Sequence, residues 1–492
     1  MKTKIALLAP VIFMLLFIGC EGTDMARFQK EAVDFASDNK IDQIEFTKLV
    51  SDIKASKEKG FSQFLGPDNE VDNKKLVGHL LKLFAAKKLA LTRNDIWPPE
   101  SEPVPAKFNV DVYIENSASM DGYVKGQTKF ETSIYSLLGA LKTSDLCDKL
   151  NLNYINRKIT FTKSNVPTEE IQDFIEKLEP STFKQMGGDR GTSDLSEILK
   201  TVIEKVDDSN LAILTSDFVF SKGKNLDSKQ FLNNQTLGTS LKFHDKLQIF
   251  DLSLIVLQLE SEFDGIYYDQ QNKPITLKTS RPYYIWIVGS SSQIKSILGK
   301  KILNYLKQGY LNHLVFQKLN EPEHPDYKIL MRPRIGEFEL NSGAKGPITG
   351  AAVSRDTQNK GIFTFTMAVK FSESMQDSKY FLDPANYQLS DNRYTLTVEP
   401  VNESDQALKG FTHKLILSTK ELSDEVLKID VVAKTPGWIG AFSSLDDANI
   451  ASDENEKHKT FGLKPVVDGV GEAFYPLSKE NIMSTLSVSI KK

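Results

Sequence analysis

Residues 115–122, with the sequence ENSASMDG, hold a carboxylate and two hydroxyls within five positions. They follow the apolar run 110–114 and precede apolar residues at helical spacing between positions 130 and 141. Carboxylate and hydroxyl oxygens are the ligands that Mg²⁺ and Mn²⁺ prefer, in shells of about six oxygens that include several waters. The segment therefore predicts a buried strand, a turn suited to a hard cation, and a helix.

Two later loops offer oxygen ligands in a similar setting. The turn 189–194 contains Thr192 and precedes apolar residues at helical spacing between positions 195 and 206. The apolar run 211–214 leads directly through Thr215 and Ser216 into Asp217. If these runs are strands of one open α/β sheet, the loops lie at the carboxyl ends of its strands, where such sheets bind ligands.

The first loop resembles the D-x-S-x-S-M signature of von Willebrand factor A domains, whose metal-ion-dependent adhesion site (MIDAS) holds one divalent cation. A threonine in a Gly-Thr turn before a helix, and an aspartate just after a strand, resemble the other two loops of that site. The resemblance implies an α/β fold with a doubly wound, mostly parallel sheet of von Willebrand or Rossmann type. It also implies an Mg²⁺ or Mn²⁺ ion held by Glu115, Ser117, Ser119, Thr192 and Asp217.

The chain departs from the family pattern at two positions. Glu115 stands where the family has aspartate, and Phe218 stands where it usually has glycine. Because Mg²⁺ demands near-ideal octahedral geometry, one extra methylene at Glu115 bears directly on the site. The alternative is a fold of this family with a degenerate, metal-free site, in which the serines cap the start of a helix.

Residues 1–19 have the pattern of a targeting segment. Lys2 and Lys4 precede the apolar stretch 5–18, which is short for a membrane span. The stretch ends in Gly19-Cys20, which resembles the cleavage site of a bacterial lipoprotein signal peptide. We expect Cys20 to carry acyl chains, palmitate among them, that anchor the protein to a membrane of the cell envelope, at its periplasmic face or at the cell surface. An ordinary signal peptide or an uncleaved anchor is the alternative.

The charge balance and the cysteines limit the partners and the chemistry. The formal net charge of -4 becomes -6 if Lys2 and Lys4 are removed, which argues against nucleic acid as a partner. Cys147 is then the only cysteine besides Cys20, so a mature chain lipidated at Cys20 has no intrachain disulfide. We expect Cys147 to be a small buried residue.

The pattern along the chain divides it into segments. Residues 20–95 predict a tether and a helical domain, and residues 96–106 form a linker stiffened by four prolines. Residues 107–320 alternate strands and helices, as in a doubly wound sheet. Residues 335–492 carry the strand alternation of an antiparallel, immunoglobulin-like sandwich, with one appended helix at 461–474.

The motifs of common enzymes are missing from the sequence. It has no G-x-S-x-G elbow, P-loop, H-E-x-x-H or dinucleotide-binding glycine pattern, and its six histidines lie in no catalytic motif. We therefore expect no enzyme. The leading hypothesis is a cell-envelope lipoprotein that binds a protein partner, whose carboxylate completes the coordination of the cation. The alternative is an envelope scaffold whose site holds no metal.

Overall fold

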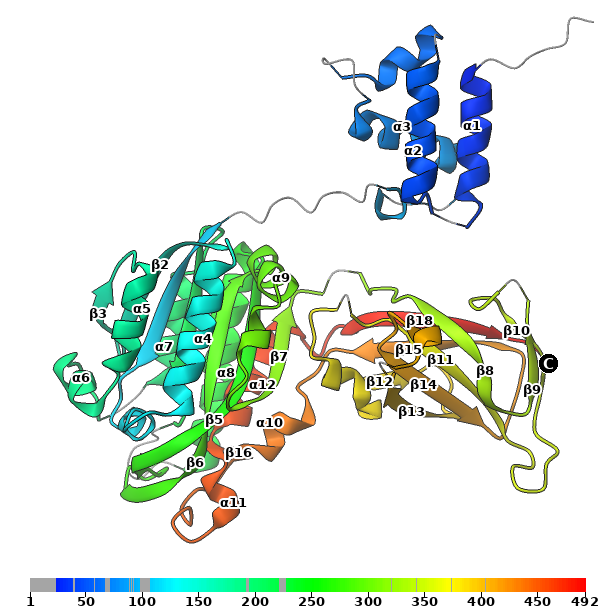
Figure 1. Cartoon of the computed structure of the whole chain (residues 1–492). Helices are drawn as coiled ribbons and strands as arrows, with labels where there is room; N and C mark the ends of the chain where they lie inside the picture. The colour runs from blue at the N-terminus through cyan, green and yellow to red at the C-terminus, as the bar shows by residue number, and fades with distance from the viewer. Residues whose placement is uncertain are drawn as a thin grey trace, which may run out of the picture. The chain divides into compact units, whose positions relative to one another are not determined.

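A computed structural model of the chain describes residues 24–38, 40–56, 58–66, 71–87, 89, 91, 93–97, 107–191, 194–220, 227–319, 321–341, 343–372, 374–402 and 404–492. By its contacts the chain divides into two compact units, one ending at Val104 and the other beginning at Pro105 (Figure 1). The predicted lipidation site Cys20 and residues 98–106 of the predicted linker lie outside the described residues.

The first unit is helical. It contains α1 (Asp24–Phe35), α2 (Gln43–Ala55) and α3 (Asn73–Ala86), with short 3-10 turns between them. At the start of α2, Asp42 accepts from the backbone N–H of Glu45 at 3.0 Å, and Glu45 accepts from the N–H of Asp42 at 2.9 Å. This capping box explains the start of α2. The core of the unit is rich in aromatic and aliphatic side chains, among them Phe28, Phe46, Leu49, Leu80 and Phe84.

A seven-stranded mixed sheet is the centre of the second unit. Its strands are β1 (Phe108–Glu115), β2 (Cys147–Ile155), β3 (Ile159–Lys163), β4 (Asn210–Ser216), β5 (Leu252–Tyr268), β6 (Pro274–Ser290) and β7 (Tyr310–Gln317). The order across the sheet is β3-β2-β1-β4-β6-β5-β7. Parallel pairing joins β2, β1 and β4, as the sequence predicts for the strands that lead into the candidate loops. The other neighbours pair antiparallel, and short connections join two of these pairs, β2–β3 and β5–β6.

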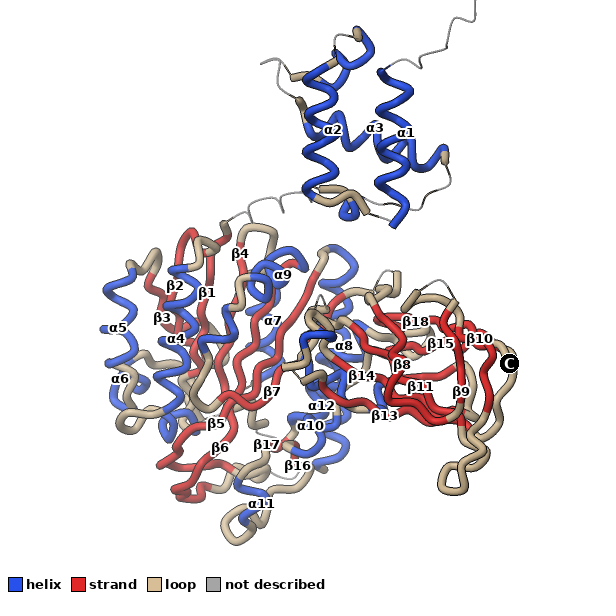
Figure 2. The backbone as a smooth tube through the Cα atoms, turned by 45° about the vertical axis from the view of Figure 1, so that its right-hand side comes forward, coloured by secondary structure: helices blue, strands red, loops and turns tan. Residues whose placement is uncertain are grey.

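Helices cover both faces of this sheet. They are α4 (Lys129–Thr143), α5 (Thr168–Glu176), α6 (Pro180–Gln185), α7 (Leu195–Glu204), α8 (Ser228–Ile249) and α9 (Ser291–Gly299). Helix α4 connects β1 to β2 on one side, whereas α7 leads into β4 on the other side of β1. Right-handed crossovers in opposite directions place α4 and α7 on opposite faces, and β1 is buried between them (Figure 2).

Two further sheets form the C-terminal part of the unit. One has the order β12-β15-β18-β10-β9 and the other β13-β14-β11-β8, and most of their strand pairs are antiparallel. The strands are β8 (Tyr327–Ile335), β9 (Glu337–Leu340), β10 (Ile348–Ala352), β11 (Phe363–Val369), β12 (Tyr387–Leu389), β13 (Tyr394–Pro400), β14 (His413–Thr419), β15 (Glu425–Val432) and β18 (Ile482–Ile490).

The chain leaves these sheets after β15 and returns in β18, the strand next to it. We call residues 437–474, which lie between, the strap. The strap contains α10 (Gly437–Ala441), β16 (Ser443–Ser444), α11 (Glu454–Lys457), β17 (Thr460–Phe461) and α12 (Leu463–Phe474). Helix α12 packs along α8, and the ring of Phe474 lies 5.6 Å from that of Phe316 in β7 (Figure 2). Helix α12, which the sequence analysis predicts at 461–474 as an addition to the sandwich, therefore packs against α8 and β7 of the α/β layer.

Close packing of α12 on α8 leads to a prediction for Gly469. A Cβ at this position would lie 2.4 Å from the carbonyl oxygen of Thr236, a backbone atom that cannot move aside alone. We expect Gly469→Ala to lower the free energy of unfolding by about 1–3 kcal/mol through overpacking. Gly471→Ala is the control, because a Cβ there meets nothing closer than 3.4 Å. Chemical denaturation of both variants tests this, and equal stabilities would contradict the packing.

Cys147 is buried at the start of β2, as predicted. Burial raises the pKa of its thiol, which keeps the side chain protonated and unreactive. Cys147 therefore serves as a small packing residue.

Within the described parts of the chain, no helix combines the length and the apolar character that crossing a membrane requires.

Candidate functional site

The register of β1 and β4 brings the first and third predicted loops together. The strands are adjacent and parallel, with Ile114 beside Thr215, so the residues that follow them emerge at one edge of the sheet. The hydroxyl of Ser216 donates to the carboxylate of Glu115. The same oxygen accepts from the backbone N–H of Phe218 at 2.8 Å, which fixes the third loop where it leaves β4.

Four of the five predicted ligands lie at this edge. The hydroxyl oxygens of Ser117 and Ser119 are 3.0 Å apart, and Ser119 lies near enough to Asp217 to lower the pKa of its carboxyl. Glu115, Ser117 and Asp217 are each at most 3 % exposed, whereas Ser119 is partly open to solvent. Ser119 is therefore the member through which a small ion from solution would first meet the group.

The two serines do not cap the following helix. Helix α4 begins at Lys129, and its capping residue is Thr128, whose hydroxyl accepts from the N–H of Glu131 at 3.4 Å. The 3-10 helix Ser119–Tyr123, which follows the serines directly, also has no side-chain cap, so the expectation that Ser117 and Ser119 cap a helix is wrong, whereas a metal-free site stays an alternative. Their hydroxyls instead face each other and Asp217, which leaves them suited to a ligand.

Thr192, the predicted ligand of the second loop, lies outside the described residues. Its neighbour Arg190 shows where the loop runs. The carbonyl of Arg190 accepts from the N–H of Ala118 at 2.9 Å, and its Nε donates to the carbonyl of Asn116 at 2.8 Å. Its guanidinium also pairs with Asp121. The second loop thus joins the first at the same edge, through an arginine that the sequence motif did not single out.

A buried arginine, Arg281, acts through its charge on the candidate ligand Asp217. Arg281, on β6, is 1 % exposed and donates to the carbonyls of Lys457 and Lys459 in the strap at 2.8 and 3.1 Å. Its guanidinium also lies 4.3 Å from the ring centre of Tyr267. No sequence signal identifies this residue, because the groups that hold it come from a distant segment.

The electrostatics of Asp217 combine opposing effects. Burial raises the pKa of its carboxyl, whereas hydrogen bonds from the Val219 backbone and from Ser119, and the charge of Arg281, lower it. The charge of Arg281 offsets only part of the effect of burial, because the pKa of Asp217 stays above its ordinary value. A buried carboxylate without a close cation favours any ligand that brings positive charge.

The donor set fits a hard cation. Two carboxylates and two hydroxyls at one edge are the oxygens that Mg²⁺ and Mn²⁺ select. Within the described ranges, this edge included, no three His, Cys, Asp or Glu side chains gather in a way that could hold a metal, so a cation here would depend on the two serine hydroxyls as well. Glu115 and Asp217 with their neighbouring serines are therefore the group to test.

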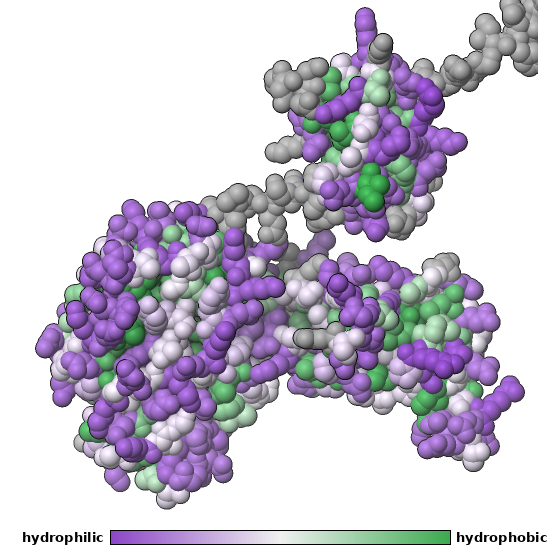
Figure 3. All heavy atoms as spheres, in the orientation of Figure 1, coloured by the Kyte–Doolittle hydropathy of each residue, from purple (hydrophilic) through white to green (hydrophobic). Residues whose placement is uncertain are grey.

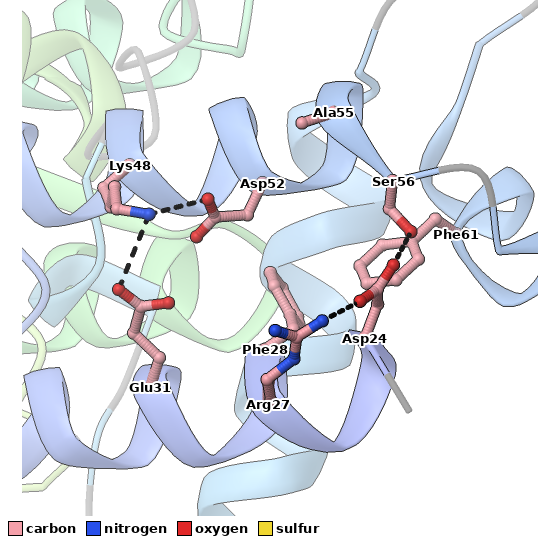
Figure 4. A pocket seen from close by; sticks show the side chains of 9 residues that line it. All are labelled: Asp24, Arg27, Phe28, Glu31, Lys48, Asp52, Ala55, Ser56 and Phe61. Carbon is pink, nitrogen blue, oxygen red and sulfur yellow. Dashed lines mark hydrogen bonds and ion pairs between the residues drawn. The ribbon is translucent and has the colours of Figure 1, made fainter. Parts of the chain in front are cut away.

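A pocket of about 380 Å³ in the helical unit is the other charged hollow of note (Figure 4). Lys48 bridges Asp52 at 2.6 Å and Glu31 at 3.8 Å across it. Burial and the charge of Asp52 raise the pKa of Glu31. Asp24, on the same wall, pairs with Arg27. These charged side chains already pair with one another, and the Glu31–Lys48 pair joins α1 to α2. We therefore interpret the charged lining of the pocket as part of the packing between these two helices.

No family model, curated protein or solved structure matches the chain. The order β3-β2-β1-β4 is the 3-2-1-4 order of doubly wound sheets, and the β5–β6 hairpin departs from it. The fold thus stands as mixed α/β with separate, largely antiparallel sheets. The resemblance to von Willebrand factor A domains rests on the residues of the three loops.

The helix after the first loop carries a titratable group whose effect is measurable. Burial raises the pKa of Glu131 to about 7, above its ordinary 4.5, because the neutral form is favoured in the fold. Its contribution to stability is therefore full below about pH 4.5 and is lost as the pH rises through about 7. We expect Glu131→Gln, which cannot ionise, to flatten this part of the stability profile.

Urea denaturation at about pH 5 and about pH 8 measures the effect. Glu169→Gln, at an exposed position in the first turn of α5, is the matched control. The Glu131 variant should gain stability relative to wild type between the two pH values, and the control should not. Parallel profiles for wild type and Glu131→Gln would contradict the burial of this carboxyl.

Proposed function

We propose that this chain is a non-enzymatic lipoprotein of the cell envelope that binds a protein partner through a divalent cation at the carboxyl edge of the β1–β4 strands. The observation that carries the proposal is the gathering at one sheet edge of the Ser117–Ser119 hydroxyl pair, the buried Asp217 carboxyl whose pKa Ser119 lowers, and the Glu115 carboxylate held by Ser216. These side chains come from two loops and serve no capping role. Membrane attachment would come from the lipid on Cys20.

The chain's own residues would hold the ion and orient one another. Ser216 fixes the Glu115 carboxylate by hydrogen bonding, and Arg190 fixes the backbone of the first loop. When bound, a divalent cation supplies residual positive charge and an open coordination position that a carboxylate of the partner can fill. The residues proposed to hold it are Glu115, Ser117, Ser119, Thr192 and Asp217.

A second candidate function is favoured by Arg281. Its buried charge favours the ionised form of Asp217 without any metal. In that case the edge is an internal polar network, the site is degenerate, and the protein is an envelope scaffold. Partner contacts would then come from the strap, the sandwich sheets or the helical unit.

The proposal includes no catalytic step. His413 hydrogen-bonds to the Ser378 carbonyl at 3.0 Å, and burial lowers its pKa. His313 contacts the Tyr310 hydroxyl at 2.6 Å, on β7. Both imidazoles thus serve local packing and hydrogen bonding, away from the candidate ligands on β1 and β4.

Affinity capture from envelope extracts tests the binding function. The full chain should retain a partner in Mg²⁺ and release it with a chelator, whereas Asp217→Asn should fail to retain it under either condition. Capture that is equal with and without chelator, and unaffected by Asp217→Asn, would favour the metal-free scaffold. Fractionation of Cys20→Ser tests the anchor separately, because a variant that still sediments with membranes would contradict lipidation.

A further inference from the structure

Helix α8 presents an outer stripe with a composition unusual for a solvent-facing helix surface. Its exposed positions recur at spacings of three and four residues, which places them on one face. Leu237 and Leu241, at the centre, are 58 % and 55 % exposed. We call the central part of this set the α8 stripe, and its members are Gln230, Asn233, Asn234, Leu237, Leu241, His244, Asp245 and Gln248. The exposed Lys229 and Ile249 stand at the two ends of the helix, outside the stripe.

The stripe is almost free of charge because the nearby lysines turn away from it. Lys242 donates to the carbonyl of Ser196 at 2.7 Å, and Lys246 donates to the carbonyl of Val206 at 2.6 Å. Both lysines thereby lie against α7. Asp245 is left as the one carboxylate of the stripe. The outer face of a surface helix is ordinarily charged.

An apolar centre with depleted charge is the composition of a protein interface. On the face shown in Figure 3, by contrast, hydrophilic residues predominate and apolar ones form small, separate patches. Other exposed leucines of the described chain, such as Leu445 and Leu477, stand outside α8. The α8 stripe thus has two neighbouring exposed leucines on a face whose only charged side chain is that of Asp245.

We propose that the α8 stripe binds a second copy of this chain, with the two α8 helices antiparallel about a two-fold axis. In this arrangement the axis passes level with the midpoint between Leu237 and Leu241. Each leucine then lies against the other leucine of the second copy. Such an interface is isologous, with the same patch on both copies.

The polar ends of the stripe are complementary in the same register. Asn233 faces Asp245 of the second copy, so an amide donor meets a carboxylate acceptor. Asn234 faces His244, and Gln230 faces Gln248, where both members can donate and accept. A parallel pair would instead bring the two copies of Asp245 together, which like-charge repulsion disfavours. The antiparallel copy therefore satisfies the whole stripe, and it does not depend on the proposed cation.

Sedimentation analysis of the full chain over a range of concentrations is the test. Wild type should show a reversible monomer–dimer equilibrium. Leu237→Asp or Leu241→Lys alone should raise the dissociation constant by about a hundredfold, since each unpaired charge occurs twice per dimer. The double variant, Leu237→Asp with Leu241→Lys, should recover much of the association, because across the axis each aspartate faces a lysine.

Leu477→Asp is the matched control, because Leu477 is 99 % exposed and lies outside α8. It should dimerise as wild type does. All four variants change exposed side chains, and unchanged thermal melting will show that they fold. A wild type that stays monomeric at every concentration would overturn the proposal. Equal weakening by Leu477→Asp, or additive losses in the double variant, would overturn it too.

Discussion

Replacing Arg281 with methionine is expected to lower the free energy of unfolding by about 3–5 kcal/mol, the cost of breaking a buried charged network by removing one partner. The guanidinium is 1 % exposed, and it satisfies the strap carbonyls of Lys457 and Lys459. Methionine keeps much of the volume but leaves both carbonyls unpaired. It also leaves Asp217 without its compensating charge. Chemical denaturation of the full chain measures the loss.

Arg157→Met is the control for this variant. Arg157 pairs with the carboxylate of Asp189 at 3.5 Å, and its side chain is 57 % exposed. Exposed pairs of this kind contribute about 0–1 kcal/mol. Similar losses for the two variants would show that Arg281 does not hold the strap as its hydrogen bonds imply.

The Arg281 variant also separates the two candidate functions. If a cation binds beside Asp217, removing a neighbouring positive charge strengthens its attraction to the site. Added Mg²⁺ should then stabilise Arg281→Met more than it stabilises wild type. If the edge is a metal-free network, Mg²⁺ should leave both stabilities unchanged.

Asp217→Asn is expected to weaken Mg²⁺ or Mn²⁺ binding by about a hundredfold or more, a larger loss than the 10–100-fold of residues that merely support a ligand. Asparagine keeps the shape of the side chain and an oxygen that can accept from the Val219 N–H, which Asp217 bonds at 3.1 Å. The variant should therefore fold. Ser119→Ala removes a neutral ligand and should weaken binding less. Equal affinities for wild type and Asp217→Asn would remove Asp217 from the ligand set.

Glu115→Asp examines the departure from the family pattern. Glu115 is 1 % exposed and hydrogen-bonded by Ser216. Aspartate is one methylene shorter, so its carboxylate would sit closer to the backbone of β1. If wild type binds weakly and Glu115→Asp binds tightly, the extra methylene limits the site. If both bind alike, the edge accommodates either length.

The sequence predicts the candidate edge well because its signals are local. The first and third loops follow short apolar runs, at 110–114 and 211–214, and the first and second loops precede helices with apolar residues at helical spacing, α4 and α7. Such patterns identify strands and helices from neighbouring residues alone. Parallel pairing of β1 with β4 then brings Glu115 and Asp217 to one edge.

The remaining features depend on contacts between distant segments, which periodicity does not encode. Strands β5 and β6 are apolar runs in the sequence, which does not show that β4, β6, β5 and β7 alternate in direction across their part of the sheet. In the sequence, Arg281 is one charged residue among many. Its role depends on the backbone carbonyls of Lys457 and Lys459 in the strap, which accept its hydrogen bonds. The placement of α12 likewise follows from Gly469, whose missing side chain admits the backbone of α8.

Calorimetric titration of the full chain with Mg²⁺ and with Mn²⁺ is the decisive measurement for the proposed cation site. We predict saturable binding of one ion per chain at up to millimolar concentrations, with thermal stabilisation, and loss of both signals in Asp217→Asn. Wild type that shows neither heat nor stabilisation with either ion would contradict the claim, and would leave Glu115, Ser119 and Asp217 as parts of an internal polar network.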